Sequence, residues 1–107
     1  MRIYMSTEYQ LTKPKTTPRL DLPEPSPYRV IYINDNSTTV EFVIETLMSI
    51  FDHSLENAVE LTDKVHDNGS ATVAVLPYEI AEQKGVEVTQ LARNNGFPLV
   101  IKLEVNE

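Results

Sequence analysis

The chain has 107 residues, including seven prolines and no cysteine, and its formal net charge is −7. This length predicts one small domain, and the lack of cysteine excludes thiol catalysis, disulfides and cysteine-ligated zinc. Residues 28–107 carry five basic and thirteen acidic side chains (5 − 13 = −8), which disfavours nucleic-acid binding and favours cationic partners such as amino groups. No apolar run could span a bilayer and no signal-peptide core is visible, so we expect a cytoplasmic protein.

The first 27 residues differ in composition from the rest. Residues 1–27 hold five of the seven prolines and the polar run TKPKTTPR. Because proline at this density cannot continue a helix or lie in a central strand, we predict a disordered N-terminal extension over 1–27 and a folded domain over 28–107. The extension is either an inert leader or a tether that engages a partner.

A strand and a polar turn open the folded domain. Residues 28–33, YRVIYI, are rich in β-branched and aromatic side chains and predict a first strand. The polar cluster 34–38 interrupts it, with apolar residues before and after. Loops that follow rigid elements often carry function, so this cluster is a candidate binding site. The alternative is that Asn and Asp only form the turn, because their side chains bond their own backbone.

Helical spacing of apolar residues predicts two helices after this turn. Thr38 and Glu41 fit a capping box for the first helix, whose apolar stripe comprises Val40, Val43, Ile44, Leu47 and Phe51. Ser54 can cap a second helix that ends at Asn68-Gly69. Its predicted inner face comprises Leu55, Ala58, Val59, Thr62, Val65 and His66.

The remaining elements are a strand, a helix and a strand. Ala71, Val73 and Val75 alternate with other residues in a second strand, and Pro77 opens a third helix that ends at Asn95-Gly96. The predicted inner face of that helix comprises Ile80, Ala81, Lys84, Val88, Leu91 and Ala92. Residues 99–105 alternate as the last strand. The order β-α-α-β-α-β predicts an α+β sandwich, with three helices on a small three-stranded antiparallel sheet.

The sequence shows no motif for a cofactor. Its three glycines are isolated, so no phosphate-binding loop is present, and His53 and His66 lack metal-ligand spacing. His66, near the end of the second helix, is either a histidine favoured by the helix dipole or a polar partner of the Asn34 turn. The acceptors of Asn34, Asn36, Asp35 and His66 together would suit an ammonium ion, which offers three donors and no acceptor. Spacing alone does not bring these groups together.

Three segments together resemble the ClpS family, whose members are adaptors that deliver N-degron substrates to the ClpA-type AAA+ unfoldase of the ClpAP protease. The segments are YRVIYINDN-x-TTVEFVIETL, AVELTDKVHDNGSATVAV and YEIAEQKGVEVTQLARNNGFPLVIKLE. The most specific motifs are ND-x-x-T-x-x-E-F-V, the VH before an x-x-G turn, and a late P-L. The resemblance covers residues 28–104, and the proline-rich extension is also similar to the flexible extension of the family.

The resemblance implies an adaptor with no catalysis of its own. We expect a monomer, because no apolar stripe is left unassigned, and no cofactor, because no cofactor motif is present. Its pocket would take the bulky apolar or aromatic first residue of a substrate, while Asn34, Asn36, His66 and Asp35 hold the free α-ammonium group. The pocket walls would come from Ile33, Thr38, Val40, Val43, Thr62, Val65 and Leu99. Glu79 and Lys84 match the positions that dock on the N-domain of a ClpA- or ClpC-type unfoldase; the alternative for both is an ordinary solvated helix face.

The chain departs from the family at three pocket positions. Asn36 stands where the family has an aspartate, and a hydrogen bond to a charged group contributes roughly 1.5–3 kcal/mol. Val40 and Thr62 stand where the family often has methionine. Both side chains are shorter, so we predict a wider, slightly more polar pocket with altered selectivity among Leu, Phe, Tyr and Trp.

Three other functions compete with the N-degron adaptor. Because Asn36 lacks the charge, the chain could be a modulator that docks on the unfoldase, alters substrate choice and binds N-degrons weakly. A small hydrolase would use His66 with Asp35 or Ser37. A structural protein is the third, because a fold does not determine a function.

Overall fold

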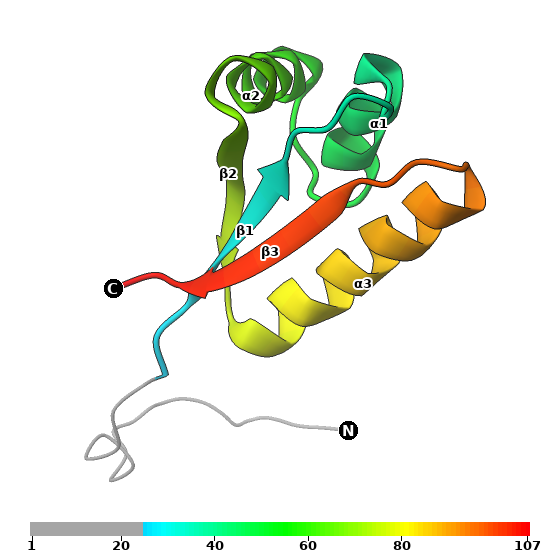
Figure 1. Ribbon diagram of the computed structural model, residues 1–107. Coiled ribbons are helices and arrows are strands. Elements are labelled where there is room, and N and C mark those ends of the chain that lie inside the picture. The colour runs from blue at the N-terminus through cyan, green and yellow to red at the C-terminus, as the bar shows by residue number, and fades with distance from the viewer. Residues whose placement is uncertain (1–24) are drawn as a thin grey trace, which may run out of the picture.

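The computed structural model describes residues 25–107, so most of the predicted N-terminal extension, 1–27, lies outside the described residues. The elements, in chain order, are β1 (Tyr28–Ile33), α1 (Val40–Ser49), α2 (Leu55–Asn68), β2 (Ser70–Leu76), α3 (Tyr78–Asn94) and β3 (Val100–Val105) (Figure 1). The predicted α+β order is confirmed. Within the described residues, no helix is both long and apolar enough to cross a membrane.

The three strands form one antiparallel sheet in the order β2-β1-β3. In the centre, β1 pairs with β2 on one side and with β3 on the other, so that Tyr28 lies opposite both Leu76 and Val105. The pairing with β2 shifts register between Val30 and Ile31, so that Val73 of β2 has no partner residue in β1. This bulge interrupts the alternation of inward and outward side chains that was predicted for β2. Val73 is buried, whereas Val75, which was predicted to share its face, is 47% exposed.

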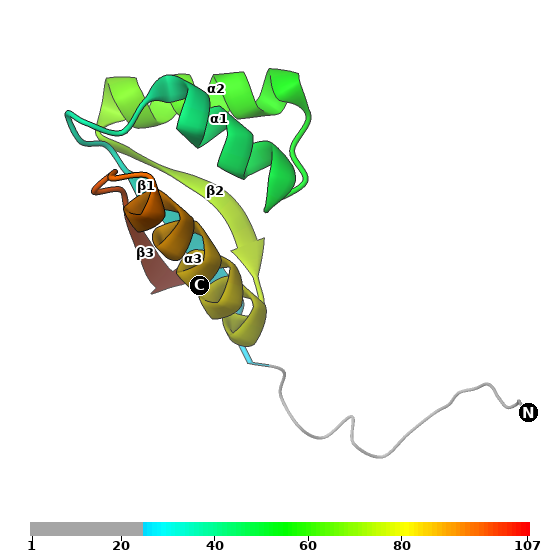
Figure 2. The same cartoon turned by 90° about the vertical axis from the view of Figure 1, so that its right-hand side faces the viewer.

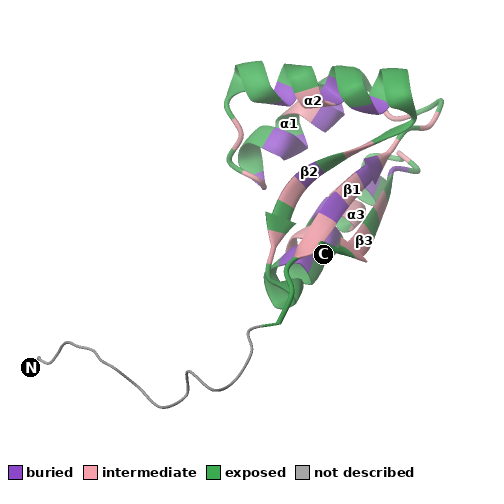
Figure 3. Ribbon diagram, turned by 90° about the vertical axis from the view of Figure 1, so that its left-hand side faces the viewer, coloured by how far each residue is buried: buried purple, intermediate pink, exposed green. Residues whose placement is uncertain are grey.

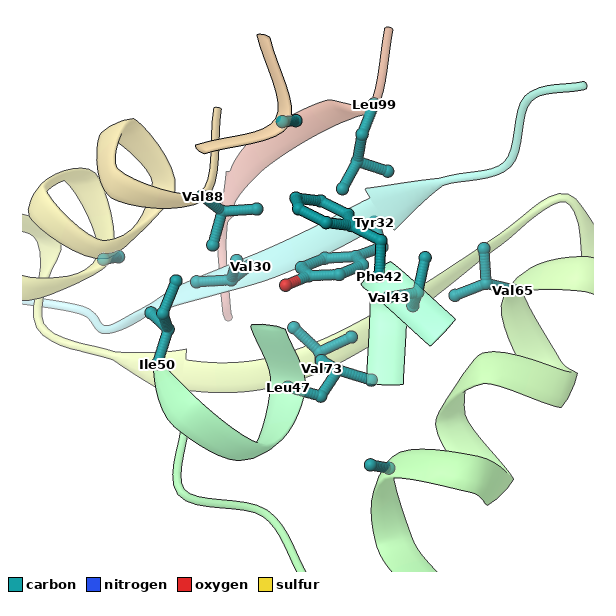
Figure 4. Packing of buried hydrophobic residues seen from close by; sticks show 13 residues of the cluster. Val30, Tyr32, Phe42, Val43, Leu47, Ile50, Val65, Val73, Val88 and Leu99 are labelled. Carbon is teal, nitrogen blue, oxygen red and sulfur yellow. The ribbon is translucent and has the colours of Figure 1, made fainter. Parts of the chain in front are cut away.

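All three helices cover the same face of the sheet. Figure 2 shows α3 in front of the strands, and Figure 3, from the opposite side, shows the strands in front of α3. On the covered face, Val30 and Tyr32 are fully buried, and side chains from α1, α2 and α3 pack around them (Figure 4). On the other face, Arg29, Ile31 and Ile33 are only half-buried. The core therefore lies on one side of a two-layer domain.

The first two helices begin at the same kind of cap, a hydroxyl that accepts a hydrogen bond from the N–H three residues later. The predicted capping box is wrong, because Thr39, not Thr38, is the N-cap of α1 and accepts a hydrogen bond from the Phe42 N–H at 3.2 Å. Thr38 lies one residue too early, and its hydroxyl bonds Asp35 instead. Ser54 caps α2 as predicted, by accepting from the Asn57 N–H.

The buried stripes of α2 and α3 are narrower than predicted. On α2 only Ala58, Thr62 and Val65 are buried, and the predicted inner residues Leu55 and Val59 are exposed, because α2 presents only one edge to α1 and β2. On α3, Ile80 is likewise exposed and Gly85 is buried in its place. A Cβ at Gly85 would lie 3.6 Å from Ile101 Cγ2, so the helix contacts β3 through a residue that has no side chain.

One hydrogen-bonded polar pair lies inside the core. The Thr46 hydroxyl donates to the Val43 carbonyl at 2.9 Å, so the Tyr32 hydroxyl is the donor in its 2.8 Å bond to Thr46 Oγ1. Burial raises the pKa of Tyr32 well above its ordinary value, although the bond to Thr46 opposes this effect. The phenol is therefore a neutral donor that ties the central strand to α1.

We predict that Thr46→Val lowers the free energy of unfolding by about 1–3 kcal/mol, because it leaves the Tyr32 hydroxyl buried without an acceptor. Urea unfolding measures this change. In the double variant with Tyr32→Phe, the total loss should be smaller than the sum of the two single losses. Strictly additive losses would show that the two hydroxyls are not coupled.

Candidate functional site

Pairing of β1 with β2 brings the end of β1 beside the end of α2. Gly69, in the left-handed conformation with φ of 88°, ends α2, and its carbonyl accepts a hydrogen bond from the Asn34 N–H at 2.9 Å. The next residue, Ser70, pairs with Ile33. His66 lies in the last turn of α2. The polar turn after β1 and the histidine of α2 are thus brought together by backbone contacts.

Asp35 builds the turn that separates β1 from α1. One carboxylate oxygen, Oδ1, accepts from the N–H groups of Ser37 and Thr38, each at 2.7 Å, and Oδ2 accepts from the Thr38 hydroxyl at 2.8 Å. The turn-forming alternative considered for this cluster thus describes Asp35 well. Its carboxylate is already engaged by three donors, and the turn that it holds presents Asn34 and Asn36.

The pKa of Asp35 lies below its ordinary value. Partial burial alone would raise this pKa, but the hydrogen bonds from Thr38 and Ser37 outweigh burial, and the positive charge of Arg93 adds to their effect. Arg93, which the sequence analysis did not single out, donates to the carbonyls of Phe97 and Leu99 at 2.9 Å each. The sequence feature that could have indicated this role is the position of Arg93 in the last turn of α3, just before Asn95-Gly96. It joins the end of α3 electrostatically to the turn.

A hollow of about 310 Å³ lies between this turn, α1 and α2. It combines a polar side with an apolar floor, and its lining residues are Asn34, Asp35, Asn36, Thr38, Val40, Val43, Thr62, Val65 and His66. Val43 and Val65, which lie at one end of the core in Figure 4, and Thr62 are buried. Val40 is 55% exposed and lies at the mouth. This volume is at the lower end of the roughly 300–1,000 Å³ typical of small-ligand sites.

Two predicted wall residues do not line this hollow. Ile33 follows the buried Tyr32 and therefore points to the open face of the sheet, where it lines a different hollow with Arg29 and Thr72. Leu99 is 1% exposed and belongs to the core. Thr62 lines the hollow, but its hydroxyl donates to the Ala58 carbonyl at 2.7 Å. The wall is therefore less polar than the threonine suggests.

The polar side of the hollow keeps its acceptors available. Among residues 25–107, no side-chain hydrogen bond involves Asn34, Asn36 or His66, and all three residues are exposed. Two amide oxygens and an imidazole nitrogen can together accept hydrogen bonds from a group rich in donors. No cluster of three or more potential metal ligands occurs in this described part of the chain.

Glu79 and Lys84 lie on α3, away from this hollow. Lys84 Nζ donates to the Ile50 carbonyl at 2.7 Å and lies 5.9 Å from the centre of the Phe51 ring, so it fastens α3 to the end of α1. Glu79 is exposed in the first turn of α3. It lines a second hollow, of about 650 Å³, with Tyr78, Ile80 and residues 25–27. No sequence pattern indicated this hollow.

The lowered pKa of Asp35 predicts an acid-dependent loss of stability. Between the native pKa of Asp35 and its unfolded value of about 3.9, the native state binds fewer protons than the unfolded state. The contribution of the Asp35 charge to the free energy of unfolding is therefore complete above the unfolded pKa. It is lost as the pH falls through the native pKa. We expect Asp35→Asn to unfold more easily than the unmodified chain at neutral pH, with the difference shrinking towards low pH. Urea unfolding over a pH series measures it.

The matched control is Asp63→Asn on α2. Asp63 is exposed and forms no hydrogen bond or ion pair with other residues in the range 25–107. It should leave the pH dependence unchanged. A difference between Asp35→Asn and the unmodified chain that stays constant with pH would contradict the role assigned to the Asp35 charge.

The chain is similar to known proteins of one family. Residues 23–102 match the family described as ATP-dependent Clp protease adaptor protein ClpS. A Treponema denticola protein named ATP-dependent Clp protease adapter protein ClpS is 47% identical over 81 residues, which are 76% of this chain and 80% of that protein. A protein of the same name from Campylobacter jejuni strain RM1221 is 40% identical over 94 residues, which are 88% of this chain and 98% of that one.

The fold also has a solved relative. The structure of Agrobacterium tumefaciens ClpS2 bound to L-phenylalaninamide superposes with a TM-score of 0.75 at 36% identity, covering 78% of this chain and 100% of that one. The relatives are named as adapters of a protease, not as proteases. By sequence match, identity and fold, the chain belongs to the ClpS family of adaptors of the ATP-dependent Clp protease.

Proposed function

We propose that this adaptor is a cytoplasmic monomer that binds the free α-amino group and the bulky first residue of N-degron substrates. It delivers them to a ClpA- or ClpC-type AAA+ unfoldase for ATP-dependent proteolysis. The observation that carries the proposal is one hollow in which available acceptors lie beside an apolar floor. A protein N-terminus with a large apolar first residue has the complementary chemistry, a charged donor next to a hydrophobic side chain.

The ammonium group is assigned to the polar side of the hollow. Its three N–H donors match the side-chain oxygens of Asn34 and Asn36 and an unprotonated ring nitrogen of His66. Asp35 contributes its negative charge at longer range, because three donors from the turn already occupy its oxygens. An acetylated N-terminus has lost both the charge and two donors, so it does not satisfy this site.

The first side chain of the substrate is assigned to the apolar floor. Val43, Thr62 and Val65 form this floor, and Val40 lies at its mouth. The ligand of the solved relative supports the assignment, because L-phenylalaninamide has a free α-amino group and an aromatic side chain. Its amide stands where the next peptide bond of a substrate would be. Ile33 and Leu99 are left out of the proposed pocket, because they face the open sheet surface and the core.

Delivery is assigned to the start of α3, on a different part of the domain from the N-degron pocket. Glu79 is exposed there and is the proposed contact for the N-domain of the unfoldase. The proposal also includes Lys84, whose stem packs near Phe51 while its ammonium group bonds Ile50. The proposed N-degron pocket lies at the start of α1 and the end of α2, so a bound substrate leaves the docking surface on α3 free.

The first test is a fluorescence-anisotropy titration with peptides that begin with Leu, Phe, Tyr, Trp or Ile. We expect binding of bulky free N-termini, and loss of that binding when the best peptide is N-acetylated, because acetylation removes the ammonium charge. Asn34→Ala and His66→Ala should each weaken binding. No binding by any peptide would contradict the proposal and favour the docking modulator.

Asn36→Asp is the matched gain-of-charge variant for the same titration. Restoring a carboxylate next to the ammonium should tighten binding by roughly tenfold, or about 1.4 kcal/mol, since a hydrogen bond to a charged group is stronger than a neutral one. Affinity for free N-termini that does not change with Asn36→Asp would show that position 36 does not contact the amino group.

We predict that Glu79→Ala weakens binding to the isolated unfoldase N-domain by up to about fivefold, or ~1 kcal/mol, the upper range for an exposed ion pair. Calorimetric titration measures it. Glu87→Ala, another exposed glutamate on α3, is the control. Lys84→Ala is a poorer probe, because it also removes the bond to Ile50. Equal affinities of the Glu79→Ala and Glu87→Ala chains for the N-domain would show that Glu79 does not contribute to the interface.

A further inference from the structure

The hollow of about 650 Å³ at the start of α3 lies beside the residues that lead into β1, and residues 25–27 and 77–80 line it. A volume of this size is within the roughly 300–1,000 Å³ typical of small-ligand sites. In Figure 1 the start of α3 lies beside the start of β1, whereas the proposed N-degron pocket lies after the end of β1. The hollow and the pocket are therefore at opposite ends of the central strand.

Contacts within the domain hold the walls of this hollow in place. The Pro27 carbonyl accepts a hydrogen bond from the Asn106 N–H at 2.8 Å, and the Pro77 carbonyl accepts one from the Ala81 N–H at 2.9 Å. The lining also contains a third proline, and each proline has a fixed φ. A wall that is already ordered loses little conformational entropy when a partner binds, so a larger part of the interaction energy appears as affinity.

The lining presents mainly apolar groups to an occupant. Its prolines have no backbone N–H to donate. Tyr78 and Ile80 are 45% and 43% exposed, although both have large apolar side chains. The Tyr78 ring packs edge-on against Tyr28, with 4.9 Å between the ring centres, and its hydroxyl already donates to Glu82 at 3.3 Å. A polar occupant would lose its bonds to water and find few free partners here, so an apolar one is favoured.

Negative charge lies next to this apolar lining. Glu79 lines the hollow and is exposed, and Glu82 lies nearby on the same helix. The body of the domain, residues 28–107, is itself acidic, with a charge of −8. These charges favour a partner that carries a cationic group beside its apolar side chain. Because an exposed ion pair contributes little affinity, burial of the apolar side chain has to supply most of it.

We infer that this hollow receives a bulky apolar side chain from the N-domain of the unfoldase, with a lysine or arginine of that domain beside Glu79. The inference rests on the proposed function, in which Glu79 contacts the N-domain, and it assigns the apolar centre of that contact. Tyr78 and Ile80 are then the residues whose truncation costs most affinity, and Glu79 lies at the polar rim.

Calorimetric titration of the full chain with the intact unfoldase, at several temperatures, tests this inference. Burial of apolar surface makes the heat-capacity change of binding negative. We expect Ile80→Ser to weaken binding by about tenfold or more and to make the heat-capacity change less negative. Tyr78→Ala should act in the same direction. Glu79→Ala should weaken binding by a smaller factor and reduce its salt dependence, with the heat-capacity change unaltered.

Val86→Ser is the matched control for Ile80→Ser. Val86 is also an exposed apolar residue of α3, but it does not line the hollow. Its replacement should leave the affinity and the heat-capacity change as they are in the unmodified chain. If the unmodified chain binds and the Ile80→Ser and Val86→Ser chains bind equally well, the inference is overturned while the proposed docking stands.

Two other outcomes would also overturn the inference. If the unmodified chain does not bind the unfoldase at all, the delivery step of the proposed function fails and the inference fails with it. Sedimentation of the free chain examines a second occupant. Self-association that Ile80→Ser abolishes would show that a second copy of this chain, not the unfoldase, fills the hollow.

Discussion

Hydrogen bonding of β1 on both of its edges is the constraint on which the rest of the structure depends. Successive side chains of this central strand point to opposite faces of the sheet. Val30 and Tyr32 lie in the core, and Arg29 and Ile31 lie on the open surface. The bond between Tyr32 and Thr46 then fixes α1 against this strand. The end of β1 thereby acquires a defined position, and the candidate site is built there.

The turn after β1 contributes both to the stability of the domain and to its proposed binding chemistry. A carboxylate that accepts three hydrogen bonds organises residues 35–38, and the amides of Asn34 and Asn36 are left facing solvent. The bond from Asn34 to Gly69 places this turn beside α2, and the left-handed conformation of Gly69 makes that close approach possible. A backbone contact, not a side-chain contact, therefore brings His66 to the hollow. Loss of the turn would separate the residues of the candidate site even if all of their side chains remained.

The order and type of the elements could be predicted from the sequence, because strand alternation, the Ser54 cap and the glycine stops are local signals. The α1 cap was assigned one residue early, since Thr38 and Thr39 are both good caps and only the bond to Asp35 distinguishes them. Ile33 was misplaced although alternation with Tyr32 already put it on the other face. The β2 bulge and the inward-facing Gly85 depend on pairing and helix approach, which no local pattern reveals.

Most of the candidate site was also predictable, but through a resemblance to a family. Spacing did not show that residues 34–38 and His66 meet, because their proximity arises from the pairing of β1 with β2, in which even the nearest partners, Ile33 and Ser70, are 37 positions apart (70 − 33). The sequence indicated Asp35 as part of the site, whereas its three hydrogen bonds within the turn depend on the folded backbone. Arg93 was missed because its effect on Asp35 crosses from the end of α3, which is distant in sequence.

In the proposed function, electrostatics explains how a site with Asn36, in place of the aspartate expected from the resemblance, can still attract an ammonium group. The acidic body, −8 over residues 28–107, supplies a long-range attraction that salt screens beyond about 10 Å at 0.1 M. At contact distance, attraction comes from amide and imidazole dipoles and from Asp35, whose charge is shared with the donors of the turn and opposed by nearby Arg93. We therefore expect recognition of the amino group to be weaker, and to depend less on charge, than it would be with an aspartate at position 36. We propose that a larger share of the discrimination between substrates therefore comes from the apolar floor around Val43 and Val65, through the fit of the first side chain.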